Sequence, residues 1–470
     1  MSTQSPVNSS LSVIVLAAGK GTRMKSVLPK VLQPLAGRSL LAHSLASVAA
    51  LKPAQTVVVV GHGAEAVKAA FKDHDLTWAL QMPQNGTGHA AAVGLAALGL
   101  APFTSSGATL LVTGDTPLIR TETLAALVAL VNDKTFALLT CAVADPTGYG
   151  RIVRNARGDV VKIVEHKDAV AAHDAAVLAL NEMNTGIMAA PTAWLRDALS
   201  RLTPHNAQGE LYLTDVIAMA ALDGLTVATA QPTREMEIVG VNDKAQLAAL
   251  EREVQLAEAH QLMRAGVTLA DPARIDVRGK LVCGSDVFID VGCVFIGNVS
   301  LGDKVTVGPN CVLKNASIGA NTTIHPMSHL EGCSVGEGAL IGPFARLRPG
   351  AALADDVHIG NFVEVKNSTL AKGAKANHLA YLGDATVGER VNYGAGSITA
   401  NYDGANKHRT VIEADVHIGS NCVLVAPVTI GAGGTVAGGS TITKDTPPAT
   451  LTVARGKQVT ITKWQRAKKT

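Results

Sequence analysis

Residues 335–365 read VGEGALIGPFARLRPGAALADDVHIGNFVEV, and every sixth residue from Val335 to Val365 is apolar. A second series with the same spacing runs from Ile418 to Ile442, often with glycine in the next position. A period of six is the signature of a left-handed parallel β-helix built from hexapeptide repeats. Each side of its three-sided coil points one apolar residue into a narrow interior, which suits Ile, Val and Leu better than aromatic residues. The aromatic content of 3% agrees with this prediction.

The six-residue spacing is interrupted twice, between Val365 and Val387 and between Tyr393 and Ile418. The first interruption contains Lys366, Asn377, His378 and Tyr381, and the second contains the stretch ITANYDGANKHR. Solenoids tolerate insertions on the face that they use for binding. We therefore expect both interruptions to be insertions, and the polar and aromatic residues within them to mark a site.

Upstream of the repeats, residues 11–240 alternate apolar β-branched runs with helical stretches. Buried strands are predicted at residues 12–19, 56–61, 109–115 and 136–143, and helices at 88–100 and 122–132. This alternation predicts a Rossmann-like α/β domain with a parallel sheet covered on both faces. Ligands of such sheets bind beyond the carboxyl ends of the strands.

A long connecting helix is predicted from Asp243 to about Ala265, because this stretch has no proline and Gly266 closes it. The predicted order is therefore an α/β domain over residues 1–242, a linker helix over 243–266 and a β-helix over 267–470, ending in a basic tail. The tail contains Lys463, Arg466, Lys468 and Lys469 and is expected to be solvated.

Composition excludes several classes of protein. The net charge of +3 gives no reason to expect a nucleic-acid or membrane partner. None of the six cysteines has C-x-x-C spacing, so neither a zinc site nor a disulfide scaffold is expected. The sequence shows no signal peptide and no apolar stretch long enough to span a bilayer, which favours a cytoplasmic enzyme.

The loop after the first predicted strand, LAAGKGTRMKSVLPK at residues 16–30, is suited to anions. Met24 stands where a dinucleotide fingerprint needs a small residue, and Gly21 stands where a Walker loop needs Ser or Thr. Glycines nevertheless let backbone N–H groups approach a phosphate. We expect another kind of phosphate site, the alternative being an ordinary βα turn with solvated lysines. Its cations are Lys20, Arg23, Lys25 and Lys30.

Motifs along nearly the whole chain, from Val13 to about Arg455, carry a resemblance. LAAGKGTRM, LPKVL, LQMPQNGTGHA, TGD, TGYGRI, VEHKDA, NTGI and GVND are similar to a sugar-nucleotide pyrophosphorylase domain. GPFARLRPG, NFVEVK, NHLAYLGD, VNYGAG and NYDGANK are similar to a hexapeptide acetyltransferase. In this order they resemble the bifunctional bacterial N-acetylglucosamine-1-phosphate uridyltransferase/glucosamine-1-phosphate acetyltransferase family. The resemblance implies a homotrimer that uses Mg²⁺ and takes acetyl-CoA as a co-substrate.

In the uridyltransferase reaction the sugar-1-phosphate oxygen attacks the α-phosphorus of UTP in line, and pyrophosphate leaves. The protein must then position the phosphates and neutralise their charge. The resemblance implies that Arg23 and Lys30 do so as catalytic residues, and that Asp115 and Asn242 bind Mg²⁺. For Asp115 the alternative is a turn former or helix cap.

The same resemblance implies a set of nucleotide- and sugar-binding residues. Gln81, Gly86 and Thr87 are expected at the uracil, and Gly150, Glu165 and Asn184 at the sugar, with a solvated carboxylate as the alternative for Glu165. The full set is Leu16, Ala17, Ala18, Gly19, Lys30, Gln81, Gly86, Thr87, Thr113, Gly114, Asp115, Gly150, Glu165, Asn184 and Asn242. Thr113 departs from the tyrosine of many relatives.

Acetyl transfer to an amine needs a base with a pKa near neutrality, and the resemblance implies that this base is His378. Arg348 and Lys366 are implied at the substrate phosphate, the alternative being a solvated edge of the β-helix. Tyr381 and Asn392 are implied at the sugar. The implied acetyl-CoA residues are Ala395, Asn401, Tyr402, Ser420, Gly438 and Arg455. Gly438 departs from a common alanine, and Arg455 could instead begin the basic tail.

The sequence thus predicts an enzyme that N-acetylates glucosamine-1-phosphate and then joins N-acetylglucosamine-1-phosphate to UTP, feeding peptidoglycan and lipopolysaccharide synthesis. One alternative is a one-reaction nucleotidyltransferase whose β-helix only oligomerises or regulates. The presence of His378 and Lys366 disfavours it. Another alternative is a non-catalytic exchange-factor subunit, which Lys30, Asp115 and Asn242 disfavour.

Overall fold

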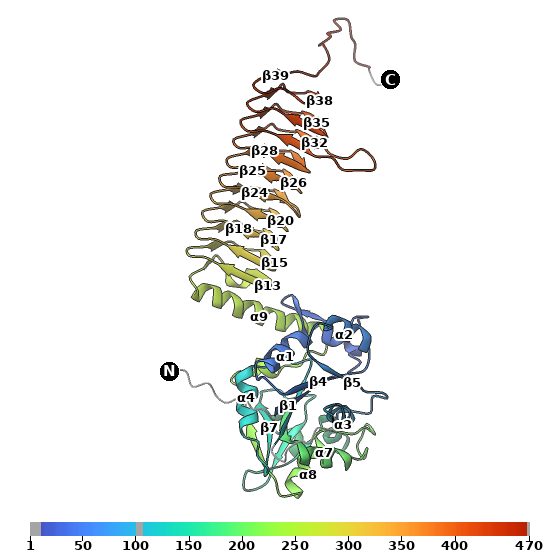
Figure 1. Cartoon of the computed structure of the whole chain (residues 1–470). Helices are drawn as coiled ribbons and strands as arrows, with labels where there is room; N and C mark the ends of the chain where they lie inside the picture. The colour runs from blue at the N-terminus through green and yellow to red at the C-terminus, as the bar shows by residue number, and fades with distance from the viewer. Residues whose placement is uncertain (1–10, 100–106, 468–470) are drawn as a thin grey trace. The chain divides into compact units, whose positions relative to one another are not determined.

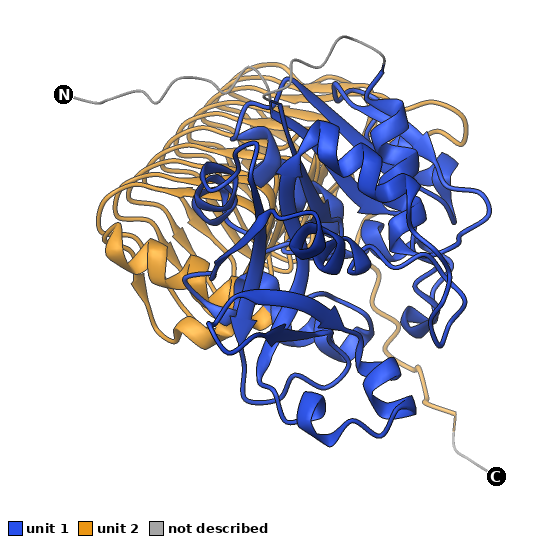
Figure 2. Cartoon of the chain, turned by 90° about the horizontal axis from the view of Figure 1, so that it is seen from below, with its two compact units in different colours: residues 1–251 blue, residues 252–470 orange. Residues whose placement is uncertain are grey.

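The computed structural model describes residues 11–99 and 107–467 (Figure 1). The chain divides into two compact units, Met1–Glu251 and Arg252–Thr470, which Figure 2 distinguishes by colour. The predicted connecting helix is present as α9 (Lys244–Arg264). The division falls inside this helix, at neither of the two boundaries expected from the sequence.

The first unit is built on a sheet of order β11-β7-β10-β6-β1-β4-β5, with β8 and β9 attached to β10. Its strands are β1 (Leu11–Ala17), β4 (Gln55–Val60), β5 (Thr77–Leu80), β6 (Ala108–Thr113), β7 (Thr135–Ala142), β8 (Arg151–Arg154), β9 (Val160–Val164), β10 (Glu182–Pro191) and β11 (Thr226–Ala230). The four strands predicted from the sequence are confirmed. A small hairpin, β2 (Pro34–Leu35) with β3 (Arg38–Ser39), lies apart from this sheet.

The expectation of an all-parallel sheet is wrong at β10, which runs antiparallel to both β6 and β7. The apolar runs predicted parallel strands, but they contain no information on the direction of β10, which lies between β6 and β7. The reversal has a consequence for function. Asn184, near the start of β10, pairs with Thr140 near the end of β7 and so lies at the carboxyl ends of the parallel strands.

Helices cover both faces of the sheet because its central strands bury side chains in both directions. On β1, Val13 and Val15 pack with α1, α2 and α4, whereas Ile14 packs with α3, α7 and α8. The helices are α1 (Leu40–Ala49), α2 (Ala64–Ala70), α3 (Thr87–Ala97), α4 (Thr121–Ala129), α5 (His166–Ala171), α6 (Ala175–Leu178), α7 (Thr192–Ser200) and α8 (Asp215–Leu222), with short 3₁₀ turns η1 (Thr22–Met24), η2 (Lys30–Leu32) and η3 (Glu235–Ile238). Leu100, where the first predicted helix ends, lies outside the described residues.

The second unit is a three-sided parallel β-helix, which confirms the prediction from the six-residue period. The 3₁₀ turn η4 (Pro272–Arg274) lies between its first two strands, β12 and β13. One side contains β12 (Thr268–Leu269), β14 (Phe288–Ile289), β16 (Thr306–Val307), β19 (Thr323–Ile324), β22 (Leu340–Ile341), β25 (His358–Asn361), β28 (Lys375–His378), β31 (Asn392–Tyr393), β34 (His417–Ile418), β37 (Thr435–Val436) and β39 (Leu451–Thr452).

The other two sides form one continuous sheet, in which the long strands β13 (Ile275–Cys283) and β15 (Cys293–Leu301) come first. The second side continues with β17 (Val312–Lys314), β20 (His329–Glu331), β23 (Arg346–Leu347), β26 (Glu364–Lys366), β29 (Tyr381–Gly383), β32 (Ile398–Ala400), β35 (Val423–Val425) and β38 (Thr441–Ile442). The third contains β18 (Ser317–Ile318), β21 (Ser334–Val335), β24 (Ala352–Leu353), β27 (Thr369–Leu370), β30 (Ala385–Val387), β33 (Thr410–Ile412) and β36 (Val428–Ile430).

The residues of both six-residue series point inward and are at most 4% exposed. The first interruption of the series is not an insertion, contrary to prediction. Leu370, Ala376 and Leu382 continue the buried column between Val365 and Val387, and two sides are simply one residue shorter. The second interruption is an insertion as predicted. It forms the projecting loop, residues 401–409, which extends from the β-helix between β32 and β33 (Figure 1).

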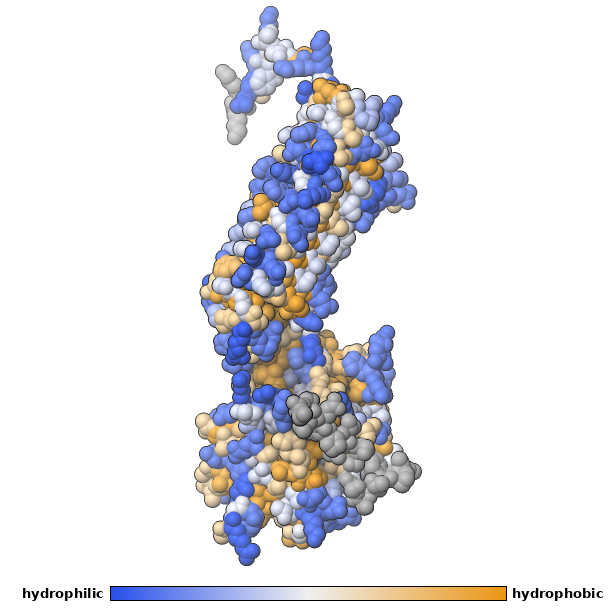
Figure 3. All heavy atoms as spheres, turned by 60° about the vertical axis from the view of Figure 1, so that its left-hand side comes forward, coloured by the Kyte–Doolittle hydropathy of each residue, from blue (hydrophilic) through white to orange (hydrophobic). Residues whose placement is uncertain are grey.

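The interior also accepts two aromatic residues, Phe295 and Tyr393, so its narrowness reduces aromatic content without excluding it. Apolar side chains reach the outer surface of the β-helix as well (Figure 3). Four of them occupy equivalent positions at one corner of successive coils. We call this set the apolar corner, and its members are Met327, Phe344, Phe362 and Leu379.

Each residue of the apolar corner is about half exposed and adopts a left-handed backbone conformation, with φ between 49° and 61°. Such a φ is unfavourable for a residue with a Cβ atom. Phe344 and Phe362 stack with their ring centroids 5.1 Å apart. None of the helices in the described part of the chain combines the length and hydropathy that crossing a lipid bilayer requires.

Two candidate active sites

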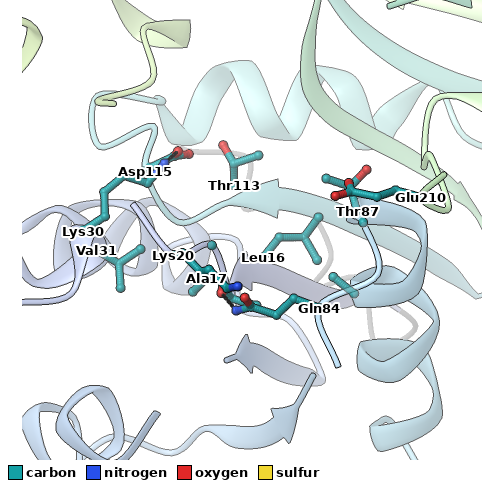
Figure 4. A pocket seen from close by; sticks show the side chains of 14 residues that line it. Leu16, Ala17, Lys20, Lys30, Val31, Gln84, Thr87, Thr113, Asp115 and Glu210 are labelled. Carbon is teal, nitrogen blue, oxygen red and sulfur yellow. Dashed lines mark hydrogen bonds and ion pairs between the residues drawn. The ribbon is translucent and has the colours of Figure 1, made fainter. Parts of the chain in front are cut away.

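The first candidate site is a cavity of about 450 Å³ at the carboxyl ends of β1 and β6 (Figure 4). The predicted anion loop forms one wall, and the start of α3 forms another. The lining residues are Leu16, Ala17, Ala18, Gly19, Lys20, Lys30, Val31, Gln84, Gly86, Thr87, Ala90, Thr113, Asp115 and Glu210. The loop is therefore part of a cavity wall, which disfavours the alternative of an ordinary solvated turn.

Lys30 is the centre of charge in this cavity. Its ammonium group forms an ion pair with Asp115 and lies 3.4 Å from Oδ1 of Asn242. Asp115 comes from the end of β6 and Asn242 from the segment before α9, and the two segments are joined because Val241 N–H donates to the Asp115 carbonyl at 3.0 Å. Two oxygens from distant parts of the sequence thus converge on one cation.

Tyr149 adds an aromatic hydroxyl to this group. Burial raises the pKa of Tyr149, the carboxylate of Asp115 raises it further, and the guanidinium of Arg23 acts in the opposite direction. Both charges are therefore close enough to act on the phenol. Arg23 itself is exposed, so its charge is available to a ligand.

Gly150, Glu165 and Asn184, expected together at the sugar, do lie together. Asn184 N–H donates to the Gly150 carbonyl at 2.9 Å. A Cβ atom on Gly150 would lie 3.4 Å from each carboxylate oxygen of Glu165 and 2.8 Å from Ile163, so a larger residue would crowd this position. Glu165 accepts a hydrogen bond from Thr214 Oγ1 at 2.9 Å, and burial raises the pKa of Glu165. It is not the solvated carboxylate of the alternative interpretation.

The second candidate site lies on the outer surface of the β-helix. Arg348 and Lys366 project from adjacent coils, because Arg348 N–H donates to the carbonyl of Val365 at 2.8 Å. Lys407, from the projecting loop, lies so close to Lys366 that it lowers the pKa of the Lys366 ammonium. Arg348 is partly neutralised by Glu364, whose Oε1 accepts from its Nη1 at 2.8 Å. Three cations therefore gather at this surface, as a phosphate would require.

Tyr381 lies beside this cationic group, where the pKa of the Arg348 guanidinium is raised chiefly by its hydrogen bond to Glu364 and further by Tyr381. Its ring covers Gly383, where a Cβ atom would lie only 2.3 Å from the Tyr381 hydroxyl oxygen. Gly383 is in register with Lys366 on the next coil. The missing side chain at residue 383 therefore makes the space in which Tyr381 lies near Lys366.

His378 ends β28 on the first side of the β-helix, next to Leu379 of the apolar corner. Its Nδ1 is 3.0 Å from Oδ1 of Asn361. Three of the residues predicted to bind acetyl-CoA, namely Ala395, Ser420 and Gly438, occupy the position equivalent to His378 on the following coils. Backbone hydrogen bonds connect this column. The carbonyl of His378 accepts from Gly396 N–H at 3.2 Å, that of Ala395 from Asn421 N–H at 2.7 Å, and that of Ser420 from Gly439 N–H at 2.8 Å.

The predicted Arg455 completes this column. Its Nη1 donates to the Gly438 carbonyl at 2.7 Å, so the side chain folds back onto the β-helix and does more than begin a solvated tail. The residues after it, up to 467, are exposed. Lys468 and Lys469 of the predicted basic tail lie outside the described residues.

Comparison with known proteins supports the fold expected for each of the two units. The profile of the MobA-like NTP transferase domain matches residues 13–210, that of the GMPPB C-terminal domain matches 277–369, and that of the bacterial transferase hexapeptide matches 409–444. The bifunctional protein GlmU of Methylibium petroleiphilum is 59% identical over 466 residues, which cover 98% of this chain and 99% of that protein.

Relatives with the same name occur in other genera. The bifunctional protein GlmU of Paracidovorax citrulli is 58% identical over 98% of this chain and 99% of its own length, and that of Bordetella bronchiseptica is 55% identical over 97% and 99%. This chain belongs to the GlmU family. It is a bifunctional transferase, with a uridyltransferase in its first unit and an acetyltransferase in its second.

Membership of the GlmU family does not by itself place each predicted residue at a ligand. Gln81 is buried outside the cavity lining, and its Nε2 donates to the Gly86 carbonyl at 2.9 Å. It supports the wall of the cavity from behind. Gly114 likewise acts through its backbone, because its N–H donates to the carbonyl of Leu16 at 2.9 Å.

Three polar residues outside the predicted binding set line the first cavity, namely Lys20, Gln84 and Glu210, together with the apolar Val31 and Ala90. Lys20 had been noted only as one of the basic residues of the loop. Gln84 stands inside the quoted motif LQMPQNGTGHA and donates to the Ala18 carbonyl, so the motif carried its signal. Glu210 had no such signal, because only folding brings its segment beside the start of α3 (Figure 4).

In the acetyltransferase unit of this GlmU relative, the predicted residues fall into separate groups. Asn392 pairs with Lys375 of β28, the strand that ends at His378, whereas Tyr381 is on β29 of the next side. Asn401 and Tyr402 lie at the far end of β32 from Ala395. Asn401 is only 8% exposed, and its amide donates to Asp384.

Proposed function

We propose that the cavity at β1 and β6 binds UTP and N-acetylglucosamine-1-phosphate, and that the outer surface around His378 and Lys366 acetylates glucosamine-1-phosphate with acetyl-CoA. The observation that carries this proposal is the presence of one constellation of cationic residues in each unit. Each constellation lies beside groups suited to the rest of its substrate.

In the first reaction the geometry supports a role in positioning and neutralisation. Lys30 and Arg23 stabilise the charge that gathers on the phosphates as pyrophosphate leaves. Gly150, Glu165 and Asn184 provide a polar surface for the sugar, and the carboxylate of Glu165 can accept a hydrogen bond from a sugar hydroxyl. The start of α3, with Gly86 and Thr87, offers backbone N–H groups to the nucleotide.

Asp115 and Asn242 suit Mg²⁺, because their oxygens already converge on the cationic ammonium of Lys30. The described residues contain no cluster of three or more His, Cys, Asp or Glu side chains arranged for a metal. Two protein oxygens completed by substrate phosphates is a usual Mg²⁺ environment. When bound, the ion would neutralise charge on the phosphate oxygens, and Lys30 would contribute a second positive charge beside it.

In the second reaction His378 removes a proton from the attacking amine. Donation from its Nδ1 to Asn361 leaves Nε2 as the free base, which fixes the useful tautomer. The new N–C bond forms at the thioester carbonyl, the C–S bond breaks and coenzyme A leaves as the thiol or thiolate. A backbone N–H near Ala395 can stabilise the oxyanion. Arg348, Lys366 and Lys407 bind the phosphate of the acceptor.

The proposed active form of the second unit is a homotrimer. Ala395, Ser420 and Gly438 lie at one end of a side, while Asn401 and Tyr402 lie at the other end, so one copy presents two partial acetyl-CoA surfaces. The apolar corner next to His378 is an exposed surface that a second copy would cover. Association through this corner would bring one copy's His378 column toward the projecting loop of another.

Two assays test the function directly. Release of coenzyme A with glucosamine-1-phosphate measures the second unit, and release of pyrophosphate with UTP and N-acetylglucosamine-1-phosphate measures the first. Both activities are expected with purified full-length protein and Mg²⁺. Replacing UTP by ATP or dTTP, or the sugar by glucose-1-phosphate, should reduce pyrophosphate release strongly, and equal rates with these substrates would contradict the proposed specificity.

A further inference from the structure

The projecting loop is connected internally by several hydrogen bonds, so its position depends on how its base is held. Asp403 organises it, because its Oδ1 accepts from Ala405 N–H at 2.8 Å and Asn406 N–H at 2.6 Å, and its Oδ2 lies 2.6 Å from His408 Nε2. The Tyr402 hydroxyl donates to the Gly404 carbonyl at 2.6 Å. The placement of Lys407 then depends on how the base of the loop is fixed to the β-helix.

Asp384, on the preceding coil, contacts both ends of the base, and Arg409 adds hydrogen bonds from its Nε to Thr386 Oγ1 at 2.8 Å and from its Nη2 to the Ala385 carbonyl at 3.1 Å. Asp384 is 7% exposed and lies at a corner with φ of 50°. Its backbone carbonyl accepts from Thr410 N–H at 3.1 Å, where the chain leaves the loop, and its Oδ2 accepts from the Asn401 amide, where the chain enters it. Its Oδ1 accepts from Asn367 Nδ2 at 2.5 Å on the coil before.

We infer that Asp384 is a positioning residue for acetyl transfer, which holds both ends of the projecting loop so that Lys407 faces Lys366 across the acceptor-phosphate site. This inference rests on the proposed role of these two lysines. The chemistry requires a carboxylate, because two amide donors, one on each side, need two acceptor oxygens. An asparagine at residue 384 would offer one acceptor and would place its own amide group against a neighbouring amide.

The negative charge of Asp384 has a second effect at this site. Lys366 and Lys407 repel each other, and the Asp384 carboxylate favours the charged form of Lys366. Without the carboxylate, the loop would lose the contact with Asn401 at its entry, although the backbone contact of Thr410 would remain, and the two ammonium groups would be freer to separate. Loss of Asp384 should therefore weaken binding of the acceptor phosphate while leaving His378 and its Asn361 partner in place.

The test is a double-mutant cycle in the full-length enzyme, measuring KM for glucosamine-1-phosphate and kcat in the coenzyme A assay. Asp384→Ala is expected to raise this KM about tenfold with a smaller change in kcat, and Lys407→Ala should do the same. If Asp384 acts through the loop, the double variant should stay near tenfold, since coupled residues are not additive. A hundredfold rise in the double variant, or a wild-type KM for Asp384→Ala, would overturn the inference.

Two further measurements separate this role from general damage. Asp355→Asn removes a similar β-helix carboxylate, which accepts from Glu337 N–H at 2.9 Å, and should leave KM unchanged. Asp384→Asn keeps the shape of the side chain and should raise KM to an intermediate value. A fall in kcat with unchanged KM in Asp384→Asn would indicate a smaller folded fraction and would contradict the inference. Absence of coenzyme A release in the wild type would instead overturn the proposed function.

Discussion

The two candidate sites manage positive charge in opposite ways. In the α/β unit Lys30 is already paired with Asp115, inside a cavity whose walls come from one chain. On the β-helix Lys366 faces another lysine on an open surface, and the groups that would complete the site lie at two different corners. The difference indicates that the first site is assembled by folding, whereas the second depends on the projecting loop and, in the proposed homotrimer, on a neighbouring copy.

The largest expected effect separates the two sites by chemistry. His378→Ala should lower coenzyme A release by about 10²- to 10⁴-fold, the usual contribution of a general base. Pyrophosphate release should not change, because the residue lies in the other unit. His329→Ala, which removes an exposed histidine from an earlier coil, is the matched control and should leave both assays intact. Loss of both activities in a well-folded His378→Ala protein would contradict the claim that the two sites work independently.

The reciprocal experiment concerns the paired lysine. Lys30→Ala should lower pyrophosphate release by about 10²- to 10³-fold, since it removes a cation aimed at the developing phosphate charge. Coenzyme A release should stay at the wild-type level. Lys25→Ala is a suitable control because Lys25 is exposed in the same loop. If pyrophosphate release fell equally in both variants, the loop would act through its overall positive charge. The specific catalytic role predicted for Lys30 would then be contradicted.

The dependence of the second site on association can be tested at the apolar corner. A Phe344→Asp, Phe362→Asp double variant should dissociate the trimer and lower coenzyme A release about tenfold or more, because buried charge opposes an apolar interface. Pyrophosphate release should persist. Sedimentation velocity gives the mass, and Leu340→Asp, at an exposed apolar residue of another side, is the control. A trimer that survives the double substitution would exclude this corner as the interface.

The smallest effect concerns the buried carboxylate of the first site. Burial raises the pKa of Glu165 above its usual 4.5. The folded state therefore binds the proton more tightly than the unfolded state, so this stabilising contribution is complete below pH 4.5 and is lost as pH rises through the raised pKa. In Glu165→Gln the side chain does not titrate, so the variant does not lose stability in this way as pH rises. Its Tm relative to wild type should increase by a few degrees between pH 4 and pH 8. A Tm difference that is the same at pH 4 and at pH 8 would contradict a raised pKa for Glu165.

The sequence was sufficient for features that repeat or that carry a local chemical pattern. The six-residue period predicted the buried positions of the β-helix because each side of a coil repeats the same environment. The apolar runs predicted four strands of the first unit, and the glycine-rich loop with Lys30 predicted an anion site at a strand end. The second interruption, rich in polar residues, was correctly interpreted as an inserted loop.

What the sequence could not give were relations between distant segments. The antiparallel direction of β10, the approach of Glu210 to the cavity and the burial of Asn401 against Asp384 all depend on three-dimensional pairing. The first interruption was misinterpreted because two sides shortened by one residue produce the same irregular spacing as an insertion. Lys407 was overlooked because only the fold of its loop brings it to Lys366.

Helix α9 has a consequence for separating the two activities. Its first part contacts the α/β unit, where Glu251 accepts from Ala36 N–H at 2.7 Å, and its second part contacts the β-helix, where buried Gln255 makes two hydrogen bonds with the backbone of Val277. A polypeptide cut between Glu251 and Arg252 would end or begin in mid-helix with unsatisfied backbone groups. Overlapping fragments that each retain residues 244–264 should therefore express better than fragments that abut.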